Sequence, residues 1–95
     1  MKLFVFKPSK YWNYCGGVLM ATASSFEEAC QRLKEKLKEI GESNDVKFRK
    51  TDFDKKEWRR RFAAGTRTYD VWVLLYELNL EDGSPDICLV EYNYA

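Results

Sequence analysis

The sequence contains no histidine, only two prolines and five glycines, and no long apolar run. Histidine supplies most general acid-base chemistry near neutral pH, so its absence removes the commonest basis for catalysis. A membrane-spanning helix needs roughly 18 apolar residues in a row. The N-terminal stretch from Lys2 to Lys7 is also too short for a signal peptide. These absences predict a soluble protein of the cytoplasm with no membrane partner.

Cysteine is scarce as well. Cys15, Cys30 and Cys88 are an odd number without close spacing, and no histidine completes a mixed metal site. We therefore expect no metal and no cofactor, and interpret the cysteines as small, partly buried apolar residues. A catalytic thiol would need a lysine or arginine as its activating neighbour. Because the sequence contains no known catalytic motif, we expect no enzyme and keep a Cys-dependent enzyme as the most distant alternative.

Apolar and aromatic side chains, in contrast, are abundant. Hydrophobic residues make up 45% of the sequence and aromatic residues 16%, which argues against disorder. A chain of 95 residues is long enough to bury one modest core and too short for two domains. We therefore predict a single domain over residues 1–95.

The first half of the chain predicts a hairpin followed by a helix. Alternating apolar residues indicate one strand from Lys2 to Lys7 and a second from Val18 to Thr22. Two serines, each with a glutamate three residues later, are typical of a helix start, and Gly41 is typical of a helix end. The helix is therefore expected from Ser25 to Ile40. Its apolar stripe comprises Phe26, Cys30, Leu33, Leu37 and Ile40.

The middle of the chain predicts a short strand and a short helix. Val46 to Lys50 alternates apolar and basic residues, as a half-exposed edge strand does. Asp54 is the expected N-cap of the helix and Gly65 its end. Trp58 and Phe62 lie four residues apart and so share a face, which we expect to anchor the helix to the sheet.

The stretch from Thr66 to Leu78 has no Gly or Pro and is apolar on both faces of a strand, so we expect it at the centre of the sheet. The last strand, Ile87 to Tyr94, is expected to form an antiparallel hairpin with it. Strict alternation would give two faces. One would carry Tyr69, Val71, Val73 and Leu75, and the other Trp72, Leu74, Tyr76 and Leu78.

The element order is thus β-β-α-β-α-β-β. It indicates an α+β fold with a mostly antiparallel sheet of four or five strands and two helices packed on one face. The second face then needs a cover, which could be the aromatic loop from Tyr11 to Tyr14, a curled sheet or a second copy of the chain. Two-fold pairing is the commonest way to bury such a face, so we expect a homodimer.

Charge is distributed unevenly along the chain. Between Lys47 and Arg67 there are nine Lys and Arg against three Asp and Glu, whereas from Thr68 onward there is no Lys or Arg and there are six Asp and Glu. Guanidinium groups suit phosphates and carboxylates, and three aromatic residues in one loop suit recognition. The candidate partner-binding residues are therefore Lys55, Lys56, Arg59, Arg60, Arg61, Arg67, Tyr11, Trp12 and Tyr14.

Each of these groups has a structural alternative. The basic helix could be a solvated face balanced by the acidic strands, and the aromatic loop could fold over the core. A pI near 7.6 and an acidic last third favour a protein partner over nucleic acid. Nucleic-acid binding through residues 47–67 is the second choice.

One stretch carries a resemblance to a known class of proteins. It reads Gly-Gly-Val-Leu-Met-Ala-Thr-Ala-Ser-Ser-Phe-Glu-Glu-Ala from Gly16 to Ala29. A strand that leads into Ala-x-Ser and then Glu-Glu-Ala resembles the small orphan proteins of phages and other mobile elements, among which are anti-CRISPR proteins. The resemblance implies a non-catalytic inhibitor in the host-cell cytoplasm that occupies a surface of a CRISPR-Cas complex. It brings no catalytic residues with it.

Overall fold

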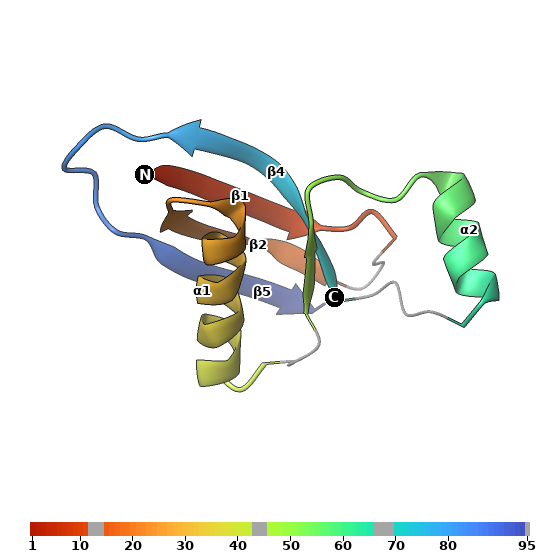
Figure 1. Cartoon of the computed structure of the whole chain (residues 1–95). Coiled ribbons are helices and arrows are strands. Elements are labelled where there is room, and N and C mark those ends of the chain that lie inside the picture. The colour runs from red at the N-terminus through yellow and green to blue at the C-terminus, as the bar shows by residue number, and fades with distance from the viewer. Residues whose placement is uncertain (12–14, 43–45, 66–69, 95) are drawn as a thin grey trace.

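The computed structural model describes residues 1–11, 15–42, 46–65 and 70–94. It confirms the predicted α+β class and element order (Figure 1). The elements are β1 (Lys2–Pro8), β2 (Cys15–Ala23), α1 (Phe26–Glu39), β3 (Lys47–Arg49), α2 (Lys55–Ala63), β4 (Val71–Asn79) and β5 (Cys88–Tyr94).

The five strands form one mixed sheet in the order β3-β4-β1-β2-β5. Three pairings are antiparallel and β3 pairs with β4 in parallel, so the sheet is mostly antiparallel as predicted. The β1–β2 hairpin is confirmed. The expectation that the strand after Thr66 is central is wrong, because β1 occupies that place. The hairpin expected between the last two strands is also wrong, since β1 and β2 lie between β4 and β5.

The strand β4 is shorter and less regular than its sequence predicts. Asp70 has a φ of 66°, a left-handed conformation that interrupts extended backbone, so the strand begins at Val71 rather than at Thr66. Residues 66–69 lie outside the described residues. A β-bulge follows, because Val5 pairs with Tyr76 and Phe6 with Leu74, which leaves Leu75 without a partner on β1.

This bulge corrects the predicted faces of β4. One inserted residue reverses the alternation, so Tyr76 and Leu78 lie on the face of Val71 and Val73 instead of on the face of Trp72. Phe6 and Leu74 pair on the opposite face, which α1 covers. The apolar residues beyond the bulge therefore collect on the face that α1 leaves open.

The helix α1 has the predicted ends. Ser25 is the N-cap and accepts a hydrogen bond from the backbone N–H of Glu28 at 3.2 Å, and Ile40 is the C-cap. The helix lies against β2 and β5 and buries Ala29, Leu33 and Leu37 (Figure 1). Ile40, which the stripe placed in the core, is 49% exposed because it stands at the helix end. Among the described residues, no helix is long and apolar enough to span a membrane.

The main core lies between α1 and one face of the sheet. Its buried members are Phe4, Phe6, Leu19, Ala21, Ala23, Ala29, Leu33, Leu37, Val46 and Trp72. Phe6 is at its centre, with ring centroids of Phe26 and Phe48 at 5.7 Å and 5.0 Å. A smaller cluster of Phe53, Val71 and Val73 forms on the other face.

The helix α2 belongs to this smaller cluster. It lies beyond one end of the sheet (Figure 1), and Trp58 packs against Phe53 together with Tyr11. Val71 and Val73 point away from α1, because they alternate with Trp72 in the main core. The expectation that both helices pack on one face is therefore wrong for α2, because its partly buried Trp58 packs on the cluster of the other face.

Candidate functional site

The exposed side of α2 carries four basic residues. Lys55 and Arg59 are four residues apart, as are Lys56 and Arg60, so the two pairs occupy neighbouring stripes of the helix. All four residues are exposed. None of their side chains makes a hydrogen bond or an ion pair with any described residue. We call these four residues the basic face of α2.

Arg61, which the sequence placed with them, has a different role. Its Nε lies 3.4 Å from Glu57 Oε2, and its guanidinium lies over the Phe53 ring, 5.5 Å from the centroid. Arg49 approaches the same glutamate from β3, with Nη2 at 3.0 Å from Oε1, and stacks at 4.0 Å over the same ring. Arg61 therefore helps to hold α2 in place and is less available to a partner.

Arg49 is a member of this arrangement that the sequence does not predict. Its local pattern indicates an edge strand and contains nothing that links Arg49 to Glu57. The two residues are eight positions apart, on different elements that meet only in the folded chain. The alternation of apolar and basic residues around Phe48 was the one available signal, because it indicated that Arg49 projects from one side of a strand.

Aromatic stacking fixes the inner side of α2. The Tyr11 and Trp58 rings stack with centroids 4.7 Å apart and an interplanar angle of 7°. The other face of Trp58 meets Phe62 at 5.3 Å. Phe62 itself is 66% exposed, so the prediction that it anchors the helix to the sheet is wrong. The anchor is Phe53, which precedes the N-cap and is 3% exposed.

A hydrogen-bonded link joins this aromatic cluster to the end of β1. The Ser9 hydroxyl donates to Asp52 Oδ1 at 2.7 Å, and the Lys10 backbone N–H donates to Oδ2 at 2.9 Å. Burial opposes ionisation of Asp52, but these bonds and one from the Phe53 backbone outweigh it and hold its pKa below the usual range. The ionised carboxylate thus ties the segment before α2 to the sheet.

The predicted aromatic loop is only partly within the described residues. Tyr11 stacks on Trp58 and so packs within the chain, as the structural alternative proposed. Trp12 and Tyr14 lie outside the described residues, and so does Arg67. Of the nine candidate residues, the structure brings Lys55, Lys56, Arg59 and Arg60 together on one exposed face.

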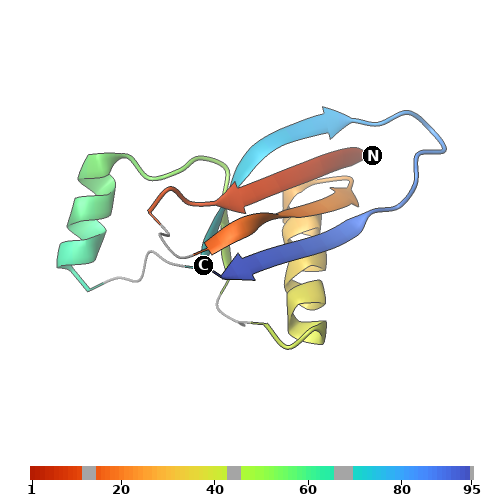
Figure 2. The same cartoon turned by 180° about the vertical axis from the view of Figure 1, so that it is seen from behind.

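The acidic part of the chain lies at the opposite end of the sheet. The segment between β4 and β5 contains Glu81, Asp82 and Asp86 and is far from α2 in both views (Figures 1 and 2). All three side chains are exposed. The longest dimension of the chain is 47 Å, so the molecule has one basic end and one acidic end.

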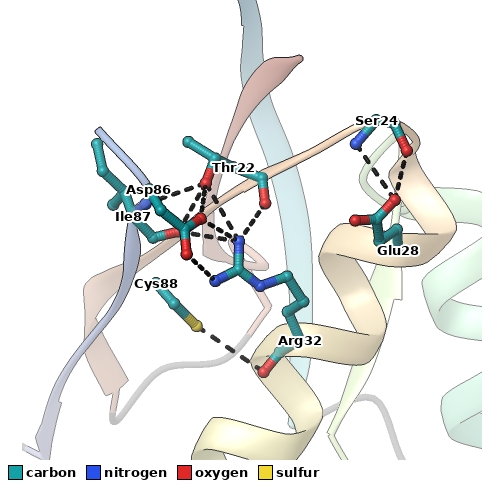
Figure 3. Close-up of polar contacts among 7 residues, drawn as sticks. All are labelled: Thr22, Ser24, Glu28, Arg32, Asp86, Ile87 and Cys88. Carbon is teal, nitrogen blue, oxygen red and sulfur yellow. Dashed lines mark hydrogen bonds and ion pairs between the residues drawn. The ribbon is translucent and has the colours of Figure 1, made fainter. Parts of the chain in front are cut away.

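A dense polar network fastens the acidic segment to α1 (Figure 3). Arg32 donates from Nη1 to Asp86 Oδ1 at 2.8 Å and from Nη2 to Oδ2 at 3.1 Å. The Thr22 hydroxyl donates to the same carboxylate at 2.6 Å, and the Ile87 backbone N–H donates to Thr22 Oγ1 at 3.0 Å. These contacts have a structural explanation, because they hold the start of β5 against the end of β2 and against α1.

The Asp86 carboxylate should make folding stability depend on pH. Hydrogen bonds from Thr22 and Arg32 hold the pKa of Asp86 below its usual range. Folding thus favours the ionised form of Asp86, which adds to the free energy of unfolding. This added stability is complete above the unfolded-state pKa of about 3.9, and it is lost as pH falls through the lower folded-state pKa. We expect Asp86→Asn to be less stable than the wild type near neutral pH, with a difference that shrinks below about pH 4. Urea unfolding of both proteins across this range measures it, and a constant difference would contradict this role.

The surroundings of the two described cysteines, Cys30 and Cys88, do not activate their thiols as nucleophiles. Burial raises the pKa of the Cys30 thiol to about 11, which keeps it protonated and weakly nucleophilic near neutral pH. The Cys88 thiol donates to the Arg32 carbonyl oxygen at 3.9 Å, within the network at the end of the sheet. Among the described residues, no group of His, Cys, Asp or Glu side chains could hold a metal ion.

The face of the sheet opposite α1 is a second exposed surface. Figure 2 shows this face with no helix across its middle. Strand register places Leu3, Met20, Tyr76, Leu78 and Leu89 on it. Tyr76, Leu78 and Leu89 are 47%, 48% and 45% exposed. Tyr11 does not cover them, because it packs on Trp58 beyond the end of the sheet. We call these five residues the open apolar face.

Comparisons with known proteins give no family for this chain. No protein-family model matches it, and no curated protein and no solved structure matches it either.

Proposed function

We propose that the protein is a non-catalytic binding module that docks on another protein, and that the basic face of α2 contacts an acidic surface of that partner. The observation that carries the proposal is the isolation of its four positive charges. Lys55, Lys56, Arg59 and Arg60 are exposed, and their side chains form no ion pair with any described residue. The nearest acid along the helix, Glu57, is already shared by Arg49 and Arg61.

The energetics of the helix support a role in binding. Like charges four residues apart on a helix destabilise it by about 0.2 to 0.5 kcal/mol per pair, and the basic face contains two such pairs. The helix has only nine residues, so its own hydrogen bonds offer little to offset this cost. An acidic partner surface would convert the repulsion into attraction across an interface.

The distribution of charge favours a protein partner over nucleic acid. Nucleic-acid binding usually relies on an uninterrupted basic field along the phosphate backbone. Here the basic end faces away from an acidic end, and the net charge of the chain is +1. Such a charge dipole orients the molecule toward a complementary protein surface, and its acidic end weakens binding along the phosphate backbone of a nucleic acid.

The most specific form of the proposal is a phage-type inhibitor of a host CRISPR-Cas complex that acts in the host-cell cytoplasm. The support is the resemblance carried by Gly16 to Ala29. In the fold this stretch forms the second half of the β1–β2 hairpin and the start of α1, and it includes the Ser25 cap. Inhibition by docking requires no catalytic side chain, and the partner's acidic surface would supply the contact for α2.

The basic face should be dispensable for folding. Replacing Lys55, Lys56, Arg59 and Arg60 together by glutamine removes both like-charge pairs and keeps residues of similar helix propensity. We expect the free energy of unfolding to stay the same or rise by about 0.5 to 1 kcal/mol. Chemical denaturation measures it. A marked loss of stability would show that these side chains are structural.

The partner class is tested with the protein as bait in host lysate, with and without nuclease treatment, alongside gel-shift assays on labelled DNA and RNA. We expect the same protein complex to be retained after nuclease treatment and no nucleic-acid shift near physiological salt. Retention that nuclease abolishes, or a salt-sensitive shift, would contradict the proposal and favour the nucleic-acid alternative. Retention of nothing in either lysate would also contradict it.

A further inference from the structure

We infer that the outer edge of β3 binds an extended, acidic segment of the partner by adding a strand to the sheet. This inference rests on the proposed protein-binding function, but it uses side chains that do not belong to the basic face of α2. Three observations at one place carry it. They are the outer edge of β3, a cavity lined by cationic side chains, and apolar side chains that line the same cavity.

The strand β3 is the edge of the sheet, and within the described parts of the chain it pairs with β4 alone. The Lys47 backbone N–H donates toward β4, to the Asp70 carbonyl oxygen at 2.8 Å. Because backbone groups alternate in direction along a parallel strand, the N–H and C=O of Phe48 face away from β4. They are the groups to which an added strand would bond, as in other cases of β-augmentation.

A cavity of about 360 Å³ opens at this edge. Its volume lies within the usual range for ligand-binding pockets. Four of its lining side chains are cationic, and they come from three elements: Lys34 from α1, Lys47 and Arg49 from β3, and Arg61 from α2. Phe48, Phe53 and Val71 complete the lining.

The charge of this cavity is only partly compensated. Glu57 forms ion pairs with Arg49 and Arg61, at 3.0 Å and 3.4 Å. Lys34 and Lys47 are exposed and make no ion pair with any described residue. The excess of positive charge selects a carboxylate-bearing segment, and the partly exposed ring of Phe48 accepts the apolar part of an adjacent side chain.

A second copy of this chain is a poorer occupant. Two β3 edges would bring Lys47 and Arg49 of each copy against one another, and like charges on an edge discourage pairing. The free edge of β5 offers a single acidic residue, Glu91, among its seven positions. A partner segment that alternates acidic and apolar residues matches both the cationic and the apolar side chains that line the cavity.

The test uses a fluorescein-labelled hexapeptide of alternating glutamate and valine, with fluorescence anisotropy as the readout. A second peptide of the same sequence carries N-methyl groups on alternate backbone nitrogens, which keeps the charge and blocks strand pairing. We expect the first peptide to bind and the N-methylated one to bind at least about tenfold more weakly. Equal binding of the two peptides, or no binding below about 1 mM, would overturn the inference.

Matched variants locate the binding. Lys34→Glu combined with Lys47→Glu should weaken peptide binding at least about tenfold. Lys36→Glu is the control, since it makes the same change on α1 but on the flank of Arg32, away from β3. Circular dichroism establishes that each variant is folded. Unchanged binding by the double variant would overturn the inference.

The four-glutamine variant of the basic face separates this inference from the proposed function. We expect it to bind the hexapeptide as the wild type does. If it loses the peptide while the Lys34→Glu, Lys47→Glu protein retains it, acidic segments bind at α2 and the inference about β3 fails while the proposed function stands. If all of these variants bind the peptide normally but none binds the partner complex, the peptide is not a mimic of the partner and the inference also fails.

Discussion

Replacing Phe6 with alanine should lower the free energy of unfolding by about 3 to 5 kcal/mol, the usual cost of removing a buried phenylalanine. Phe6 lies on the central strand and is 0% exposed. Its ring contacts those of Phe26 and Phe48, so it joins β1 to both α1 and β3. The total free energy of unfolding of a single domain is usually about 5 to 15 kcal/mol, so the variant should be only marginally folded.

Phe62→Ala is the matched control, because it makes the same chemical change at a residue that is 66% exposed. Among the described residues, its ring contact is one stacking pair with Trp58, and such pairs contribute about 0.5 to 1.5 kcal/mol. Thermal or urea unfolding of both variants tests the placement of the core. Equal losses of stability would contradict it, because they would require Phe62 to be buried.

The open apolar face should hold two copies of the chain together. A two-fold axis parallel to the strands would place this face against its own copy. Lys7 on β1 and Glu91 on β5 project from this side of the sheet and are exposed. Neither has an ion-pair partner among the described residues. A second copy offers each of them the opposite charge. We therefore expect a dimer at micromolar concentration.

Leu78→Lys together with Leu89→Lys should convert this dimer to a monomer. Both side chains are nearly half exposed, so the substitutions are tolerated within one chain, but they place two charges in the interface. Ile40→Lys is the control, since Ile40 is 49% exposed at the end of α1 and lies off this face. Sedimentation equilibrium decides the matter. A wild type that sediments at the 11.3 kDa of one chain would contradict the dimer.

Local features of the fold were predictable from the sequence because they depend on neighbouring residues. Ser25 and Asp54 cap the two helices, as their side-chain chemistry predicts, and the β1–β2 hairpin joins adjacent segments. The edge position of β3 also followed from its alternation of apolar and basic residues. Each of these features is decided within a few positions along the chain.

Strand order and the bulge were not predictable in this way. Nothing near Leu75 indicates that it will lack a partner, because the bulge arises from the register between β4 and β1. That single insertion moves Tyr76 and Leu78 to the open apolar face. Likewise, the pairing of β5 with β2 depends on a contact between distant segments, which Arg32 and Asp86 help to close.

The candidate site was predicted in part. The sequence identified the basic residues of α2, and helical spacing alone places Lys55 with Arg59 and Lys56 with Arg60. The same spacing also places Glu57 with Arg61, a signal that the interpretation of Arg61 as a partner-binding residue did not use. The contacts of this pair with Arg49 and Phe53 come from the preceding segment and depend on the fold. The cavity beside β3 combines side chains from three elements, so only the folded chain brings them together.

The most direct test of the proposed function is the affinity of the retained partner complex for the wild type and for the four-glutamine variant of the basic face, measured across a range of salt concentrations. We expect wild-type affinity to fall as salt rises, because exposed charges are screened. The variant should bind at least about tenfold more weakly at low salt and show little salt dependence. Wild-type affinity in the variant would contradict docking through α2.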